Sequence, residues 1–266
     1  MSFIDVNNLW KCYGDSVVLE RVNTKVNAGE FITIVGTSGC GKTTFLNMLL
    51  GIESATKGEL LLEGAPVIDE PNEDRGIVFQ RYSVFPHLNV LDNVILPIEF
   101  EQSRFWGKLF NEKRQAAYEK AYQMLELVGL SAAKNKYPHE LSGGMQQRLA
   151  IAQALMKSPK ILLLDEPFGA LDPGIRKDMY KLILDIWRKT GVTIFMITHD
   201  LGEGFYLGTR LWVFDKVRYE PDNPNAYGAT ITYDIPVGKC DTQTYQEIDQ
   251  SLIKNKLNNH TLEGQI

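Results

Sequence analysis

The stretch that decides the fold is GTSGCGKT, residues 36–43, which matches the pattern G-x-x-x-x-G-K-[ST]. A short run of apolar and β-branched residues, Phe31 to Val35, precedes it, and a helix-forming stretch from Thr43 to Leu50 follows it and stops at Gly51. Glycines let backbone N–H groups curl around an anion, and a helix N-terminus adds unpaired donors. This strand–loop–helix context favours a phosphate-binding loop over an ordinary Gly/Ser turn before a helix.

The loop and the first helical turn are therefore expected to bind the phosphates of a nucleotide. Lys42 supplies a cation for the β- and γ-phosphates, and Thr43 supplies a hydroxyl for Mg²⁺. The candidate nucleotide-binding residues of this stretch are Gly36, Thr37, Ser38, Gly39, Cys40, Gly41, Lys42, Thr43 and Thr44.

Two adjacent carboxylates, Asp165 and Glu166, follow the apolar run Ile161 to Leu164. Successive strand residues point to opposite faces, so we expect the two acids to do different work. Asp165 is placed to hold Mg²⁺, directly or through water, and Glu166 to act as the general base for an attacking water. Alone, the pair could equally be two acids at the end of a strand, but a phosphate loop in the same chain favours catalysis.

Three short apolar runs organise the chain: Phe31 to Val35, Lys160 to Leu164 and Thr193 to Ile197. Strands that are apolar on both faces indicate a parallel sheet covered by helices. Polar residues begin where each run ends, which is the edge where such sheets bind ligands. The middle of the chain, from about Val90 to Leu155, is expected to be largely helical, with apolar residues at helical spacing in Lys113 to Leu127.

The predicted fold class is α/β, a P-loop NTPase core with a mainly parallel sheet, an N-terminal antiparallel β portion and an inserted α-helical subdomain. We predict an ATPase domain over residues 1–217, with the helical subdomain at about 84–155, and a C-terminal extension over 218–266. Within the extension, the alternation of Ala229 to Ile235 predicts an edge strand, and Thr242 to Asn259 has room for one helix.

Composition narrows the class of protein. The chain has 266 residues, 44% of them hydrophobic, and a formal net charge of −5, which are ordinary globular values. The mild acidity argues against a dedicated nucleic-acid binder. Three cysteines are too few and too scattered for a disulfide framework or a zinc site. We expect no signal peptide and no membrane span, so a role at a membrane would require a partner.

The segment LSGGMQQR, Leu141 to Arg148, resembles the signature motif of ABC-transporter ATPase subunits. The order of motifs is also that of the family: phosphate loop, Gln80, signature, acidic strand and His199. Gly169 to Asp172 resembles the loop that follows the acidic strand, and Tyr13 the aromatic residue that stacks on adenine. The resemblance covers roughly Ser2 to Val217.

The resemblance implies an ATPase in which two subunits sandwich two ATP molecules. The signature of one subunit closes on the γ-phosphate held by the other, so Ser142, Gly143, Gly144 and Gln147 would bind ATP in trans. The residues agree, because a small residue and two glycines before a helical stretch, Met145 to Met156, form a second anion site. Leu-Ser-Gly-Gly alone is a weak signal, since it also matches an N-cap turn. The partner subunit is a second copy or a paralogue.

Roles for Gln80 and His199 also follow from the resemblance. The amide of Gln80 contacts Mg²⁺ or the attacking water and senses the membrane partner. His199 contacts the γ-phosphate and orients the catalytic geometry. In isolation Gln80 could be a surface residue, His199 a polar cap at a strand end, and Tyr13 a core aromatic.

The family also implies partners and location: integral membrane permease subunits, an external solute-binding protein indirectly, and a peripheral position at the cytoplasmic face of the membrane, with no nucleic acid. Tyr82 to His87 would line a groove for a short helix of the permease, or pack within the helical subdomain. Gln102 to Phe110 resembles an insertion, whose aromatics could contact the partner, the bilayer surface or, more simply, the rest of the chain.

Three motif stretches are most similar to those of the nitrate/sulfonate/taurine importer group: 38–44, 78–82 and 164–173. Tail features such as Gly208 to Arg210 and Phe214 to Val217 resemble members associated with urea or guanidine use. The chain departs from the family at Leu201 to Phe205, where relatives often have Glu-Ala after the His-Asp pair, and its tail is too short for a regulatory β-domain.

Other classes fit less well. A soluble ABC-type ATPase acting on nucleic acid would place a very long coiled coil between loop and signature, and one acting on the ribosome would carry two cassettes in one chain. A small GTPase-like switch would carry an Asn-Lys-x-Asp string, which does not occur in this sequence.

Overall fold

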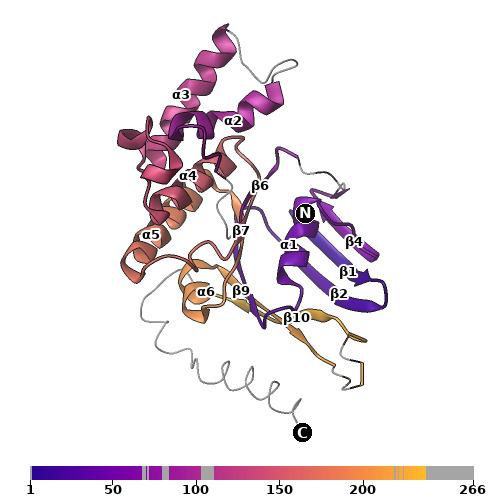
Figure 1. The fold of residues 1–266 in the computed structure, drawn as a ribbon. Helices are drawn as coiled ribbons and strands as arrows, with labels where there is room; N and C mark the ends of the chain where they lie inside the picture. Colours follow the sequence, from indigo (N-terminus) through magenta and orange to yellow (C-terminus); the bar gives the residue numbers. More distant parts are fainter. Residues whose placement is uncertain are drawn as a thin grey trace. The chain divides into compact units, whose positions relative to one another are not determined.

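The computed structural model describes residues 2–67, 70, 72–79, 84–102, 111–218, 220, 222–223 and 225–237, with backbone only at 101–102 and 111–113. The chain divides into two compact units (Figure 1). Unit 1 comprises Met1–Asp69 and Thr198–Ile266, and unit 2 comprises Glu70–Ile197. The predicted Gln80, most of the predicted insertion and the predicted tail helix lie outside the described residues.

Unit 1 begins with an antiparallel β portion. Strand β1 pairs antiparallel with β2 on one side and with β4 on the other, and β4 pairs with the short strand β5. Ile4 and Val6 of β1 alternate with more exposed residues and are buried, and after a register shift between Val6 and Leu9 the buried Leu9 continues the core side of the strand. The bounds are β1 Ile4–Tyr13, β2 Ser16–Val26, β4 Lys57–Leu62 and β5 Ala65–Pro66.

The strand that leads to the phosphate loop lies in the same unit. Strand β3 (Phe31–Gly36) pairs parallel with β9 (Arg210–Lys216). Helix α1 (Lys42–Leu50) covers one face, where the Phe45 ring lies 5.4 Å from the Phe214 ring and also contacts Trp212. Helix α6 (Leu201–Leu207) packs on the alternate residues of β3 and β9 through Phe205. Both faces of β3 and β9 are thus buried, as their continuous apolar sequences predict.

The C-terminal strand β10 (Ala229–Pro236) is not the edge strand that its alternation predicts. It pairs antiparallel with β9 along its whole length and parallel with β2 at Ala229↔Leu19, so it lies between them in the order β5-β4-β1-β2-β10-β9-β3. Among the described residues, its pairing with β2 is limited to this one end. The predicted domain boundary at 217/218 therefore falls inside the sheet of unit 1.

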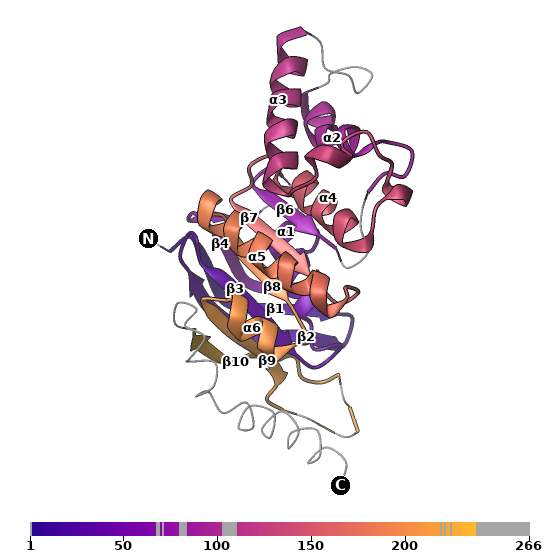
Figure 2. The same ribbon diagram turned by 90° about the vertical axis from the view of Figure 1, so that its left-hand side faces the viewer.

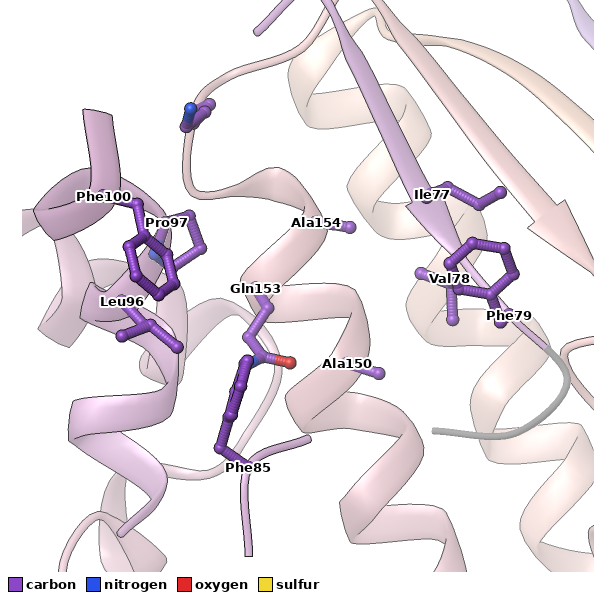
Figure 3. A pocket seen from close by; sticks show the side chains of 11 residues that line it. Ile77, Val78, Phe79, Phe85, Leu96, Pro97, Phe100, Ala150, Gln153 and Ala154 are labelled. Carbon is purple, nitrogen blue, oxygen red and sulfur yellow. The ribbon is translucent and has the colours of Figure 1, made fainter. Parts of the chain in front are cut away.

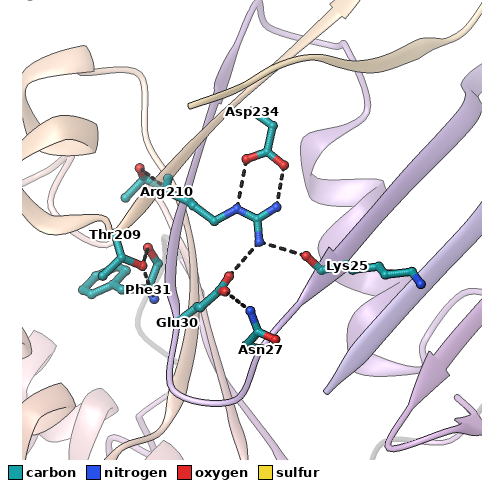
Figure 4. A network of polar contacts seen from close by, with 8 residues as sticks. Lys25, Asn27, Glu30, Phe31, Thr209, Arg210 and Asp234 are labelled. Atoms are coloured by element: carbon teal, nitrogen blue, oxygen red, sulfur yellow. Dashed lines mark hydrogen bonds and ion pairs between the residues drawn. The ribbon is translucent and has the colours of Figure 1, made fainter. Parts of the chain in front are cut away.

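An arginine fastens this part of the sheet (Figure 4). The Arg210 guanidinium in β9 donates two hydrogen bonds to the Asp234 carboxylate in β10, at 2.9 and 2.5 Å. It also donates to Glu30 Oε2 at 2.7 Å and to the Lys25 carbonyl at 2.8 Å, at the turn between β2 and β3. Planar, bidentate geometry makes such contacts stronger than isolated surface pairs. Arg210 thereby ties β10 and this turn to β9.

Unit 2 contains three parallel strands in the order β8-β7-β6 and four α-helices among its described residues. Helices α2, α3 and α4 pack on one another (Figure 2), and along the chain they lie between β6 and β7. The core face of α3 is formed by Ala117, Ala121 and Leu125, as their spacing predicts. The bounds are β6 Arg75–Val78, α2 Val90–Gln102, α3 Asn111–Leu127, α4 Gly143–Leu155, β7 Ile161–Asp165, α5 Pro173–Thr190 and β8 Thr193–Ile197, with short 3₁₀ turns at Ser131–Ala133 and Pro138–Glu140.

The predicted fold class is confirmed: parallel strands with helical cover, an N-terminal antiparallel portion and helices inserted between strands. None of the helices in the described part of the chain combines the length and the apolar character needed to cross a bilayer.

Candidate functional site

The phosphate loop is built around a buried lysine. Strand β3 ends at Gly36 and helix α1 begins at Lys42, and Thr37, Ser38 and Gly39 are exposed between them. The Lys42 side chain is buried, and its Nζ donates hydrogen bonds to the Gly36 carbonyl at 2.8 Å and the Thr37 carbonyl at 2.7 Å. These bonds hold a positive charge inside the loop, where an anion on the exposed side can meet it.

Only glycine fits where the loop leaves the strand. Gly36 has φ 153°, and a Cβ there would lie 2.2 Å from the Phe214 carbonyl oxygen. Helix α1 begins after Gly41, and no side chain in the described part of the chain caps it. First-turn N–H groups of α1 need acceptors, and the exposed Thr43 lies among them. A helix start with a buried cation and small loop residues fits the phosphates of a nucleotide.

Cys40 fills the inside of the loop rather than reacting. Its side chain is buried, with Sγ 3.8 Å from Lys42 Nζ. Burial raises the pKa of the Cys40 thiol above its ordinary value, although the Lys42 charge opposes this. The residue therefore remains a neutral thiol at neutral pH.

Tyr13, the last residue of β1, lies beside α1. Its ring is 49% exposed, which rules out the core-aromatic interpretation. Its hydroxyl donates to the Glu53 carboxylate and also contacts the Thr44 side chain in the first turn of α1. Lys11 Nζ lies 4.9 Å from the ring centroid. An exposed aromatic ring next to the phosphate-loop helix is suited to stacking on a nucleotide base.

His199 lies at the end of unit 1 that carries the phosphate loop. The preceding residue, Thr198, donates its backbone N–H to the Ile34 carbonyl of β3 at 3.1 Å. The Thr198 hydroxyl donates to the buried carboxylate of Glu203, and Asp200 accepts the N–H of Gly202 at 2.7 Å. These contacts fix the backbone on either side of His199, whose side chain is exposed.

The glycine at position 204 has a packing reason. A Cβ at Gly204 would lie 2.7 Å from Leu211 Cδ1, because α6 packs closely on β9. Glycine at this position allows the short helix to lie against the sheet.

Unit 2 carries the two acids. Asp165 is the last residue of β7, and both Asp165 and Glu166 are half-buried. Glu166 lies beyond the strand with φ 47°, and its N–H donates to the Ile197 carbonyl at 3.1 Å. The prediction that strand alternation points the two acids to opposite faces is therefore wrong for Glu166, which lies beyond β7 and whose side chain leaves the chain from a left-handed backbone conformation. Such conformations cost about 1 kcal/mol or more and occur often at functional sites.

The signature segment forms the head of α4, also in unit 2. Ser142 is the N-cap, and its hydroxyl accepts the Met145 N–H at 3.4 Å. Ser142 and Gly143 are exposed, whereas Gly144 is buried, and a Cβ there would lie 2.6 Å from Ile175 Cγ2 of α5. The exposed pair leaves the helix start open to an anion.

Gln147 does not fit the role predicted for it. Its side chain is fully buried in α4, and neither amide atom has a hydrogen-bond partner among the residues that the structure describes. Burial leaves no surface for a nucleotide on another subunit, so we leave Gln147 out of the proposed site.

Sequence reasoning missed most of an apolar groove in unit 2 (Figure 3). Its volume is about 350 Å³, and it lies between β6, the segment around Phe85, α2 and α4. Phe85, from the segment that we predicted to line a groove, is 40% exposed there. The other side chains that line it are Ile77, Val78, Phe79, Leu96, Pro97, Phe100, Ala150, Gln153, Ala154 and Lys157. Phe100 is 67% exposed, which the sequence alone does not reveal.

A buried asparagine gives the groove a fixed wall. Asn93 of α2 is fully buried, and its side chain accepts the Phe85 N–H at 2.8 Å and donates to the Phe85 carbonyl at 3.0 Å. Gln153 of α4 donates to the Asn93 side chain at 3.1 Å. Because satisfied buried polar groups hold a unique geometry, Phe85 is fixed beside α2.

Several known proteins with similar sequences are named as transport or import ATP-binding proteins. The chain is 42% identical over 214 residues to the bicarbonate transport ATP-binding protein CmpD of Synechocystis sp., covering 79% of this chain and 73% of the relative. It is 43% identical over 198 residues to the nitrate import ATP-binding protein NrtD of Synechococcus elongatus, covering 74% and 69%. Spermidine/putrescine import ATP-binding proteins also match, but the chain spans only 56% of the length of the one from Roseobacter denitrificans.

A solved structure agrees in fold. The dimeric post-hydrolysis state of the ATP-binding cassette MJ0796 bound to ADP and Pi superposes with a TM-score of 0.70 at 28% identity, covering 89% of this chain and 99% of that one. Residues 19–169 match the family described as ABC transporter. The chain therefore belongs to the ABC transporter family and is one of its ATP-binding, ATP-hydrolysing subunits, as its similarity to the bicarbonate transport and nitrate import proteins indicates.

Proposed function

We propose that this chain powers a solute importer: it binds ATP with Mg²⁺, pairs with a second ATPase subunit and drives permease subunits from the cytoplasmic face of the membrane. The observation that carries the proposal is the presence of two open anion-binding helix starts in one chain. One is the phosphate loop with the buried Lys42, and the other is the exposed head of α4 at Ser142. Each would supply half of a nucleotide site.

The residues in hand suit the chemistry of phosphoryl transfer. The Thr43 hydroxyl, the Asp165 carboxylate and the Gln80 amide are the oxygen ligands that Mg²⁺ prefers. Mg²⁺, when bound, neutralises charge on the phosphates. The Lys42 ammonium stabilises negative charge on the γ-phosphate oxygens in the transition state.

Glu166 acts as the general base and accepts a proton from the attacking water. Its left-handed backbone sets the direction in which the side chain leaves the chain, so the alternation of β7 does not apply to it. His199 donates a hydrogen bond to the γ-phosphate, which orients it for attack. The adenine stacks on the exposed ring of Tyr13.

Pairing of two subunits completes each site. Ser142 and Gly143 of one subunit contact the γ-phosphate held by the loop of the other, through the hydroxyl and the N–H groups at the head of α4. Loss of the γ-phosphate removes this contact, so hydrolysis reopens the pair.

The groove of unit 2 receives the permease. Its lining is mainly apolar, and its exposed Phe85 and Phe100 are suited to anchor a short amphipathic helix. Relatives named for bicarbonate, nitrate and spermidine/putrescine import share this domain, so the solute is set by the membrane subunits and by an external binding protein. An association with urea or guanidine stays a prediction from the tail sequence. The import relatives favour this function over a soluble ATPase acting on nucleic acid or the ribosome.

Size-exclusion chromatography and an ATPase assay of purified variants together test the proposal. With Mg²⁺ and ATP, Glu166→Gln should elute as a dimer and hydrolyse ATP about 10² to 10⁴ times more slowly than the wild type. Lys42→Ala should remain monomeric, and Asp178→Asn, an exposed acid of α5, should behave like the wild type. Wild-type turnover by Glu166→Gln with no ATP-dependent dimer would overturn the assignment.

A further inference from the structure

A glutamate with no role in phosphate binding lies at the centre of a polar cluster beside the phosphate-loop helix. Glu53 follows α1, and its carboxylate accepts hydrogen bonds from the Tyr13 hydroxyl and from Asn47 Nδ2 of α1, the latter at 3.2 Å. It also pairs with Lys11 Nζ at 3.2 Å, and its side chain is 21% exposed. Three donors from β1 and α1 therefore converge on one carboxylate.

The lysine of this cluster lies over the tyrosine ring. Lys11 Nζ is held by Glu53 and by the Ser54 carbonyl at 2.9 Å, and it lies 4.9 Å from the centroid of the Tyr13 ring. A cation at this distance is attracted to the negative face of the ring. Lys11 Nζ thus lies over one face of the Tyr13 ring. Because the residue as a whole is 49% exposed, the face opposite Lys11 is the one that we assign to a base.

The ionisation of the pair agrees with this geometry. Burial and the neighbouring Glu53 raise the pKa of Tyr13 above its ordinary value. Burial also acts to raise the pKa of Glu53, but the hydrogen bonds from Tyr13, Asn47 and Lys11 outweigh it and lower that pKa. A neutral phenol that donates and a charged carboxylate that accepts are both stable at neutral pH.

We infer that Glu53 is a positioning residue for the adenine of ATP: with Lys11 it fixes the Tyr13 ring against α1, so that the base stacks on the face opposite Lys11. This inference rests on the proposed function, in which Tyr13 stacks on adenine. The Thr44 contact of Tyr13 sets the ring at a constant place relative to the phosphate loop. Base and phosphates of one nucleotide are thereby bound at matched positions.

A merely structural role predicts something different. If Glu53 only fastened the segment after α1, its loss would loosen the helix that carries Lys42 and would weaken phosphate binding itself. The two roles are separated by a ligand that has the phosphates but no base. Inorganic tripolyphosphate is such a ligand.

Calorimetric titration of the full chain with ATP and with tripolyphosphate makes the test. Glu53→Ala should weaken ATP binding by about 2- to 10-fold, the cost of ordering one freed side chain on binding, and leave tripolyphosphate binding unchanged. Tyr13→Phe, which keeps the ring and removes the donor, should reproduce this effect. Glu53→Gln should restore most of the affinity for ATP, because its amide oxygen still accepts from Tyr13. Glu59→Ala, an exposed acid of β4, serves as the matched control.

The outcomes are distinct. Equal losses for ATP and tripolyphosphate in both Glu53→Ala and Tyr13→Phe would overturn the positioning role, as would unchanged ATP affinity in those variants. If Tyr13→Ala itself leaves ATP affinity unchanged, the adenine contact of the proposed function fails, and the inference fails with it. A loss of ATP affinity in Tyr13→Ala without a loss in Glu53→Ala overturns the inference alone.

Discussion

The substitution Gly144→Ala should show how tightly the signature helix α4 packs against α5. A Cβ there would lie 2.6 Å from Ile175 Cγ2, about 1 Å closer than the optimum for two carbons. Ile175 is β-branched, so the clashing group cannot rotate away easily. We expect overpacking to cost about 1–3 kcal/mol in the free energy of unfolding, offset by up to about 1 kcal/mol from the better helix propensity of alanine.

Ile175→Ala removes the clashing atom and separates the two contributions. In the double variant the new methyl group occupies space that Ile175 vacates, so the double variant should be more stable than the sum of the single effects predicts. We expect a coupling energy of at least about 1 kcal/mol, measured by urea unfolding of the wild type, both single variants and the double variant. Additivity within about 0.5 kcal/mol would refute the close contact between α4 and α5.

Three further predictions address catalysis, the groove and the loop. Glu166→Asn replaces the proposed base with a shorter, uncharged amide and should abolish turnover while ATP affinity is kept. A parallel loss of ATP affinity, measured by equilibrium titration, would contradict the base assignment. Phe100→Ser should weaken binding to native membranes that contain the permease by up to about 200-fold, since roughly 130 Å² of exposed ring at about 25 cal/mol per Å², or about 3 kcal/mol, is at stake. The comparably exposed Val217→Ser should leave this binding unchanged, and equal behaviour of the two variants would argue against the groove. Because burial raises the pKa of the Cys40 thiol above its ordinary value, iodoacetamide at pH 7 should modify Cys12 before Cys40, as followed by mass spectrometry of the two sites. Fast modification of Cys40 would contradict its burial.

The elements around the phosphate loop were predictable because local signals agree there. The apolar run Phe31 to Val35, the glycines and the helix from Thr43 to Leu50 each point to strand, loop and helix, and the observed β3 and α1 match to within a residue. The same holds for α3, whose buried positions follow the period of a helix.

Contacts between residues distant in sequence were not predictable. The hydrogen bond from Tyr13 to Glu53 joins residues 40 positions apart, and the need for glycine at Gly204 depends on Leu211 across the sheet. The predicted edge position of β10 was wrong because alternation of apolar and polar residues indicates that one face of the sheet is exposed. It does not indicate which strands pair with β10. The predicted direction of Glu166 was wrong because β7 ends at Asp165, one residue before Glu166. The alternation of strand side chains therefore does not extend to Glu166.

Shared nucleotide sites are the central claim, and mixing two inactive variants tests it most directly. Lys42→Ala disables the phosphate loop, and Ser142→Arg disables the signature, so each variant alone should have almost no turnover. Mixed in equal amounts, they should recover about a quarter of wild-type turnover, since half of randomly formed pairs hold one intact composite site. If the mixture stays as inactive as its components while both variants remain folded, each site is complete within a single chain or is not formed in this way.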